Sequence, residues 1–179
     1  MTLTIDRDMS LVARVVASPL GALTLIASAD ALVGVYFEDH RPAPRVRADR
    51  TGPSAALDVA EAQLASYFAH ASHRPQLPLA PRGSALELAV WSELARIPSG
   101  ETRTYGAIAR ALGRPTAARA IGSAVARNPL SIVVPCHRVI GADGSLAGFA
   151  GGVERKAWLL AHEGVAQRGV PGGIVASPY

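Results

Sequence analysis

Three closely spaced prolines divide this chain into two parts of different character. Pro75, Pro78 and Pro81 lie within HRPQLPLAPRG, and a proline can neither donate a backbone hydrogen bond nor continue a helix. We therefore interpret this segment as a linker. The sequence predicts an N-terminal unit over residues 1–83 and a second unit over residues 84–179.

The composition supports two packed units. Of the 179 residues, 49% are apolar and 18% are charged, which excludes disorder as the dominant state. No apolar run approaches the roughly 20 residues of a membrane span, so we expect no membrane association. Asp6, Arg7 and Asp8 stand where an export signal needs an apolar core. We therefore expect a cytoplasmic protein.

The first unit has the alternating pattern of strands. Residues 11–18, 22–29 and 32–38 follow one another at hairpin spacing, which predicts a three-stranded antiparallel sheet. Residues 39–54 are polar and rich in proline and arginine, and are predicted to form a loop. Apolar residues from Leu57 to Phe68 then recur at helical spacing. We expect an α/β domain in which this helix covers one face of the sheet.

The second unit is predicted to be mainly helical. Ser84 and Glu87 fit a capping box at the start of the first helix. A short helix over residues 105–112 is followed by one over residues 117–127, for which Thr116 is the expected cap. Two short helices joined by a tight turn favour a helix-turn-helix, although other small helical hairpins have the same pattern.

The positive charge of the chain lies in this second unit. The formal net charge is +4, and between Thr102 and Ala142 there are arginines but no acidic residue. Such a stretch is typical of a phosphate-binding surface, and an ordinary solvated face is the alternative. The six arginines of this stretch are Arg103, Arg110, Arg114, Arg119, Arg127 and Arg138.

The chain contains one cysteine, Cys136, which excludes an intrachain disulfide and a multi-cysteine zinc site. A lone cysteine is commonly a small buried hydrophobe, but His137 and Arg138 beside it can favour a thiolate nucleophile. Residues 132–134 read as a short buried strand that leads to it. Since neighbouring side chains of a strand point to opposite faces, either the chain turns at Pro135 or a water relays the proton.

A histidine that acts as a base is usually oriented by a third group. Glu163 follows an apolar helix over residues 157–162 and precedes Gly164, and it is the candidate for that group. The alternative is a solvated acid near a helix end.

These residues resemble a known family. PCHRVI, with AARAIGSAVARNP before it and LAGFAGGVERKAWLLAHEG after it, is similar to the C-terminal domain of the O6-alkylguanine-DNA alkyltransferases, also called methylated-DNA--protein-cysteine methyltransferases. The resemblance is dense over residues 84–165 and looser before them, through SPLGALTLIAS. It implies a ribonuclease-H-like N-terminal fold and a winged-helix-like C-terminal domain with a helix-turn-helix.

The resemblance implies DNA repair by direct damage reversal. Such a protein flips O6-alkylguanine, and in some cases O4-alkylthymine, out of duplex DNA and transfers the alkyl group irreversibly to its own cysteine, with one turnover per molecule and no cofactor. Cys136 is then the nucleophile and alkyl acceptor, and His137 is the general base acting through water. Glu163 orients His137, Asn128 is the hinge between helix and active site, and Tyr105 donates to guanine N3.

The family also implies contacts to the flipped base. The main-chain carbonyls of Cys136 and Val139 accept from the exocyclic amine, and Ala150 supplies a main-chain N–H on the O6 side. Phe149 stands where many members have tyrosine, so stacking survives without a hydroxyl contact, and Ala150 replaces the serine of some members. Ala147 in place of glycine is predicted to narrow the pocket for bulky alkyl groups.

The expected partner is double-stranded DNA. Arg119 matches the family's arginine finger, which fills the space left by the flipped base; a phosphate contact is the alternative. A helix lined with small residues suits close approach to the minor groove, where the family binds, and predicts little sequence specificity. Besides Arg119, the residues expected to contact DNA are Thr116, Ala117, Ala118, Ala120, Gly122 and Ser123.

Two other functions fit parts of the pattern. An alkyltransferase-like protein recognises damage without chemistry, but such proteins lack the cysteine that Cys136 supplies. A cysteine hydrolase would turn over, and it would need an oxyanion hole that the sequence does not reveal. We expect a monomer, with assembly on DNA as a further possibility. We expect no metal site, because His70 and His73 lack further ligands.

Overall fold

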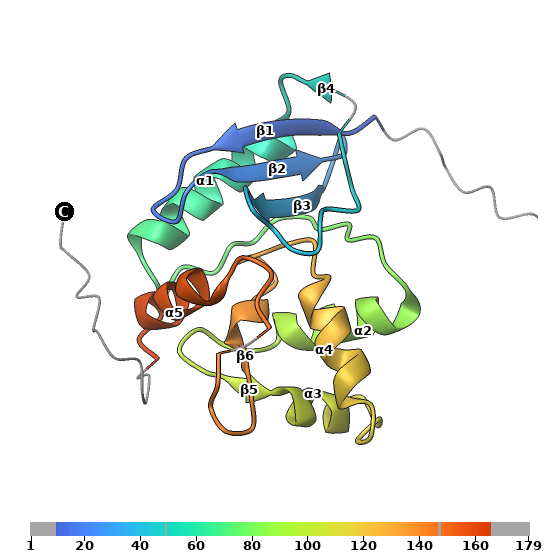
Figure 1. Ribbon diagram of the computed structural model, residues 1–179. Coiled ribbons are helices and arrows are strands. Elements are labelled where there is room, and N and C mark those ends of the chain that lie inside the picture. The colour runs from blue at the N-terminus through green and yellow to red at the C-terminus, as the bar shows by residue number, and fades with distance from the viewer. Residues whose placement is uncertain (1–9, 49, 147, 166–179) are drawn as a thin grey trace, which may run out of the picture.

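The computed structural model describes residues 10–48, 50–146 and 148–165 of the chain. It has two layers, with a small sheet and one helix above and a helical bundle below (Figure 1). The upper layer comprises β1 (Val12–Val16), β2 (Leu23–Ala27), β3 (Leu32–Phe37), β4 (Arg50–Thr51) and α1 (Ala55–Ala69). The lower layer comprises α2 (Ala85–Ala95), β5 (Arg103–Thr104), α3 (Tyr105–Ala111), α4 (Ala118–Ala126), the 3-10 helix η1 (Cys136–Arg138), β6 (Val139–Ile140) and α5 (Val153–His162).

The antiparallel meander predicted for the first unit is confirmed. The sheet order is β3-β2-β1-β4, with β2 antiparallel to both of its neighbours. The predicted loop over residues 39–54 needs one correction, because β4 lies within it and pairs parallel to β1. An exposed strand edge offers unpaired backbone groups, and β4 covers that edge of β1 for two residues.

Strand β3 connects the two layers. All six of its residues are buried. One face of the strand packs in the apolar cluster that α1 and the second half of the chain share, and the other face packs against Val46 and Ala80. The backbone N–H of Val35 donates to the carbonyl of Pro129, and Ser131 donates back to Val35. The proline-rich segment is also bound to this strand, since Ala80 donates to the carbonyl of Leu32. Side chains from both layers therefore form one continuous apolar cluster.

One of the two predicted helix-start signals is confirmed, because Ser84 and Glu87 form the capping box of α2. Ser54, which the sequence analysis did not single out, caps α1. The cap predicted at Thr116 is wrong. Helix α4 begins one residue later than expected, with Ala117 as its N-cap and no side-chain cap bond, because a turn from Arg114 to Ala117 occupies the preceding residues.

The strand predicted over residues 132–134 is also wrong. This segment is a turn, closed by a hydrogen bond from the N–H of Val134 to the carbonyl of Leu130. Ile132 within it has φ 73°, which is a strained value for a β-branched residue. Its apolar side chains are buried by the turn's position against β3 rather than by pairing in a sheet. The turn delivers the chain to Cys136.

Candidate active site

Cys136 begins the 3-10 helix η1 and is 3% exposed. The chain turns at Pro135, which was the first of the two alternatives for bringing Cys136 and His137 to the same side. Because η1 is helical, His137 does not point to the opposite face of a strand but lies within the protein core, with no exposed surface. The thiol, the imidazole and the side chain of Asn128 are thus placed in one buried region.

Asn128 holds the thiol in place. Its Nδ2 donates to Sγ of Cys136 at 3.1 Å and to the carbonyl of Val134 at 2.8 Å, while its Oδ1 accepts from the N–H of Leu130 at 3.1 Å. The residue is 1% exposed. Asn128 follows Arg127, the C-cap of α4, and therefore links that helix, the turn and the thiol.

The Cys136 thiol is protonated at rest. Burial raises its pKa, and this outweighs the hydrogen bond from Asn128 and the positive charge of Lys156, which act in the opposite direction. The expectation that Arg138 favours the thiolate is wrong, since its guanidinium binds Glu163 and the carbonyl of Ile97 instead. A base must therefore remove the thiol proton during any reaction.

His137 has the state that a base requires. Burial lowers its pKa, against the opposing effect of Glu163, so the imidazole is neutral. Its Nε2 lies 2.9 Å from Oε1 of Glu163, and because a carboxylate only accepts, Nε2 carries the proton. Nδ1 is then the basic nitrogen. It is buried, and among the described residues it has no hydrogen-bond partner.

Glu163 is a buried carboxylate, not the solvated acid of the alternative interpretation. Nε and Nη2 of Arg138 each donate to it at 2.7 Å, and Tyr67 donates its hydroxyl at 2.7 Å. Burial alone would raise the pKa of this carboxyl, but the bonds from His137 and Arg138 and the Arg138 charge outweigh burial and lower it to about 2. Sequence reasoning missed Arg138 and Tyr67 as partners of Glu163.

Tyr105 and the segment that carries Phe149 lie against each other. Gly148 has φ 85°, and a Cβ there would lie 2.5 Å from the Tyr105 hydroxyl oxygen. The Tyr105 ring packs on Gly122 of α4. Burial raises the pKa of Tyr105, and a negative charge on Cys136 would raise it further. Tyr105 is therefore close to the thiol, to α4 and to the 148–151 segment.

Phe149 and Val139 complete this region. The Phe149 ring is edge-on to His137, with centroids 6.4 Å apart, and Ala150 beside it is buried. The carbonyl of Val139 accepts a hydrogen bond from Nζ of Lys156 at 2.5 Å. Burial lowers the pKa of Lys156 to about 8. Sequence reasoning missed this lysine, which is fully buried beside the cysteine motif.

The comparisons with known proteins agree with one another. A family model described as "6-O-methylguanine DNA methyltransferase, DNA binding domain" matches residues 85–165. The chain is 45% identical over 150 residues to the methylated-DNA--protein-cysteine methyltransferase of Mycolicibacterium paratuberculosis. The matched region covers 84% of this chain and 90% of that protein. The chain belongs to the methylated-DNA--protein-cysteine methyltransferase family.

Two further relatives extend this methyltransferase family match. The protein of the same name from Methanosarcina acetivorans is 42% identical over 147 residues, covering 82% of this chain and 94% of that protein. The crystal structure of Mycobacterium tuberculosis OGT in complex with DNA superposes with a TM-score of 0.76 at 41% identity, covering 84% of this chain and 91% of that one. The upper sheet with its helix and the lower helical DNA-binding domain are thus the family's arrangement.

The residues expected to contact DNA in a methyltransferase of this family lie on and before α4. Arg119 is exposed on the first turn, with Ala118 and Ala120 on either side. Thr116 is exposed although it caps no helix. Ala117, Gly122 and Ser123 are half-buried. In the described part of the chain, none of these residues forms a side-chain hydrogen bond with Cys136, His137 or Glu163.

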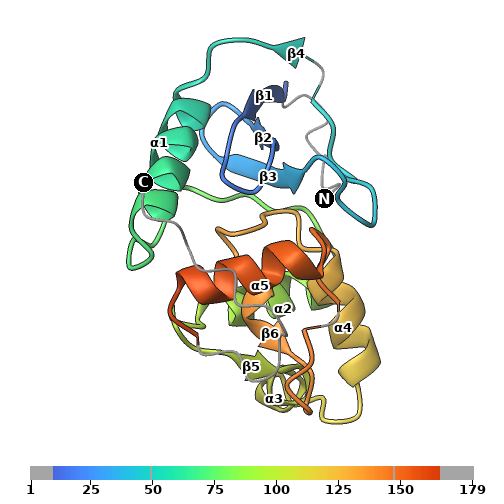
Figure 2. The same ribbon diagram turned by 60° about the vertical axis from the view of Figure 1, so that its left-hand side comes forward.

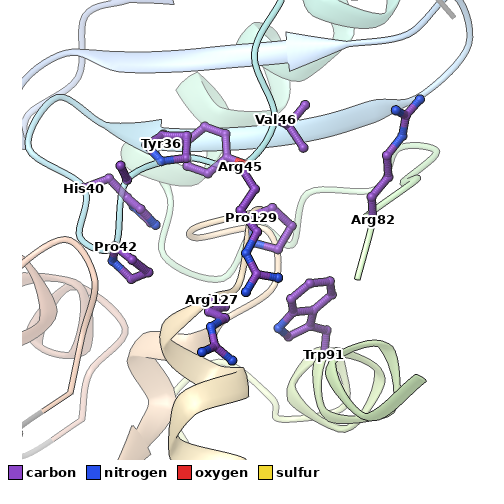
Figure 3. Close-up of a pocket in the computed structure, with 11 residues that line it drawn as sticks. Tyr36, His40, Pro42, Arg45, Val46, Arg82, Trp91, Arg127 and Pro129 are labelled. Carbon is purple, nitrogen blue, oxygen red and sulfur yellow. The ribbon is translucent and has the colours of Figure 1, made fainter. Parts of the chain in front are cut away.

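A separate pocket lies between the layers on the side of α2 and the C-terminal end of α4 (Figure 3). Arg45 and Arg127 both line it (Figure 3), and both form ion pairs with Glu87, at 3.2 and 3.6 Å. None of the residues predicted for the methyltransferase site lines this pocket. It lies between the 40–46 segment and the end of α4, and Cys136 does not line it.

Three predictions remain, on Ala147, on a metal site and on a membrane span. Ala147, predicted to narrow the alkyl pocket, lies outside the described residues. Within the described ranges, no cluster of three or more His, Cys, Asp or Glu side chains is arranged to hold a metal ion. In the same ranges no helix has the length and apolar character needed to cross a membrane.

Proposed function

We propose that this protein repairs O6-alkylguanine in DNA by moving the alkyl group onto Sγ of its own Cys136. The observation that carries the proposal is the buried arrangement of Cys136, His137 and Glu163. It supplies a protonated thiol, a neutral imidazole and an ionised carboxylate in one buried region. Family membership supplies the substrate class, O6-methylguanine in DNA.

The chemistry follows from the protonation states. Nδ1 of His137 takes the thiol proton through a water molecule, and the ionised Glu163 stabilises the imidazolium that forms. Sγ then attacks the alkyl carbon. The C–O6 bond breaks with its electron pair on O6. The guanine anion takes a proton at N1 from water, and the imidazolium of His137 returns the thiol proton to water. A hydrogen bond from Tyr105 to N3 offsets the charge that develops on the purine.

The flipped base would be held by main-chain and aromatic groups. A carbonyl oxygen has two lone pairs, so Val139 can accept from the guanine amine while it also accepts from Lys156. The carbonyl of Cys136 is the second acceptor, and Ala150 offers its N–H on the O6 side. Phe149 provides a face for stacking, and as a phenylalanine it makes no hydroxyl contact.

Duplex DNA is proposed to lie along α4 with the minor groove toward the small residues. Ala118 and Ala120 allow close approach, and Arg119 between them enters the stack in place of the flipped base. Phosphate contacts from the arginines of the 102–142 stretch supply affinity without base readout. We therefore propose binding with little sequence specificity, by a monomer whose alkyl-transfer domain starts at residue 84.

The reaction consumes the protein. The product is a thioether, which has no activated leaving group for hydrolysis, and the chain has no second cysteine to accept the group. One alkylation of Cys136 therefore ends the activity of a molecule. A cysteine hydrolase would instead release product and react again.

Mass spectrometry tests the proposal directly. The protein is incubated with duplex DNA that contains one O6-methylguanine, and the tryptic peptide bearing Cys136 is analysed. We expect a gain of one methyl group per molecule, no gain with undamaged DNA of the same sequence, and no gain in Cys136→Ala. Repeated turnover without protein modification would overturn the proposal.

A further inference from the structure

A residue of the N-terminal layer reaches the carboxylate that orients the proposed base. Tyr67 lies near the end of α1 and donates its hydroxyl to Oε1 of Glu163 at 2.7 Å, although the two residues are 96 positions apart. Tyr67 is 1% exposed. In both ribbon views the end of α1 lies next to α5, which leads to Glu163 (Figure 2).

The position of this hydroxyl is fixed by further contacts between α1 and α5. Nε2 of His162 donates to the backbone carbonyl of Tyr67 at 2.9 Å, and the two rings are edge-on with centroids 5.4 Å apart. The Trp158 ring stacks on His162 at 4.8 Å. The residue before Glu163 is thus held against the backbone of Tyr67, so the 2.7 Å bond does not depend on a mobile side chain.

The hydroxyl acts as a donor in this bond. Burial raises the pKa of Tyr67 and the charge of Glu163 raises it further, so the phenol keeps its proton. Oε1 of Glu163 accepts from Tyr67, His137 and Nη2 of Arg138 together. The hydroxyl and the imidazole therefore share the negative charge of the same oxygen atom.

We infer that Tyr67 is a positioning residue for alkyl transfer, through which the N-terminal layer holds Glu163 against His137 and limits how strongly that carboxylate attracts the imidazole proton. The inference rests on the proposed function, because it concerns the base of the same reaction. It gives the N-terminal layer a part in the chemistry beyond supporting its neighbour.

A purely structural role for Tyr67 would leave the pH dependence of alkyl transfer unchanged, whereas the positioning role alters it. Without the hydroxyl, more negative charge on Oε1 is available to the imidazolium, which raises the pKa of His137. The charges of Arg138 and Lys156 also act on His137 and lower its pKa, and the variant leaves both residues in place. The base is active only when neutral, so the acidic limb of the pH–rate profile moves to higher pH in Tyr67→Phe. The carboxylate is also less well oriented. We expect a roughly ten-fold lower maximal rate, since general-base catalysis as a whole contributes about 100-fold or more.

The experiment uses the full-length protein and free O6-benzylguanine, so that DNA binding does not enter the rate. The rate of Cys136 alkylation is measured from about pH 4 to about pH 9 for the parent, Tyr67→Phe and Tyr36→Phe. The range extends well below the ordinary histidine pKa, because burial lowers the pKa of His137. Tyr36 is a matched control, because it is also a buried tyrosine of the N-terminal layer and its hydroxyl bonds to the backbone of Val46. Tyr36→Phe is expected to keep the parent profile.

A second variant keeps the shape of the side chain. Replacement of Tyr67 by 3,5-difluorotyrosine makes the hydroxyl a stronger donor, which withdraws charge from Oε1 and moves the acidic limb to lower pH. Opposite shifts in the two Tyr67 variants support the inference, and the fluorinated variant tests it alone if Tyr67→Phe does not fold. Affinity for duplex DNA is expected to be unchanged in both, since Tyr67 lies away from α4.

Two results would overturn the inference. One is a Tyr67→Phe or difluorotyrosine profile identical to that of the parent, and the other is a lower rate with no movement of the acidic limb. A parent protein that is not alkylated at Cys136 would instead overturn the proposed function. The two failures are therefore distinguishable in one set of measurements.

Discussion

The ring of Phe149 lies edge-on to the ring of Phe37, with 6.0 Å between their centroids. Phe37 ends strand β3, whereas Phe149 belongs to the segment proposed to hold the base. The guanidinium of Arg155 covers Phe37 at 4.9 Å, and a Cβ at Gly151 would lie 2.5 Å from the Phe37 ring. The N-terminal sheet thus forms one wall for the 148–151 segment.

The first prediction concerns this wall. Phe37→Leu removes the edge-on partner of Phe149, and an aromatic pair is worth about 0.5–1.5 kcal/mol beyond its buried area. We expect slower alkylation by free O6-benzylguanine with unchanged affinity for undamaged DNA. Leu25→Ala, a core deletion in the neighbouring strand β2, is the control for stability. Equal rate losses in both variants at equal thermal destabilisation would contradict the prediction.

The second prediction concerns Gly148. An alanine at this position would adopt a left-handed conformation, at a cost of about 1–2 kcal/mol, and would also displace the Tyr105 hydroxyl. Gly144→Ala is the matched control, because Gly144 has φ 83° and a Cβ added there would meet nothing within 4 Å. We expect both variants to lose thermal stability, Gly148→Ala at least as much as Gly144→Ala. Alkyl transfer should be slowed by about 100-fold only in Gly148→Ala, as a misplacement of about 1 Å can cause. Equal transfer rates would refute it.

The third prediction separates two roles for Arg119. Arg119→Ala and Arg114→Ala each remove one exposed arginine of the same stretch, so both lose similar phosphate attraction and salt dependence. If Arg119 fills the stack, only its loss slows repair of duplex DNA well beyond the change in affinity. Both variants should react normally with free O6-benzylguanine. Matching repair rates in single-turnover assays would instead assign Arg119 to a phosphate contact.

The fourth prediction concerns acid stability. The pKa of Glu163 is lowered to about 2 from an ordinary 4.5, so its ionised form stabilises the fold above about pH 4.5 and this stability is lost as the pH falls toward 2. The contribution is roughly 3 kcal/mol. Urea unfolding between about pH 6 and about pH 2.5 should show this loss in the parent. In Glu163→Gln the curve should be flatter, and parallel curves would exclude the assignment.

Local sequence patterns predicted the helices and strands correctly where residues close in sequence determine the structure. The three antiparallel strands, α1 and the capping box of α2 depend on alternation, helical spacing and a side chain three residues away. The segment before Cys136 is a turn but was predicted as a strand. An apolar run of three residues is too short to show a periodicity that would distinguish a strand from a buried turn. Its conformation is decided by its contact with β3, as the bond from Val35 to Pro129 shows.

The sequence by itself determined the motif and its chemistry. One thiol, an adjacent histidine, a carboxylate and a cationic stretch without acids are matters of residue identity, and they were sufficient to identify the family. Only the tertiary structure decided the protonation states of those groups. Burial keeps Cys136 a thiol and His137 neutral, and Arg138 and Tyr67 surround Glu163. Desolvation and charge contacts depend on which distant segments pack together, and no local pattern encodes that.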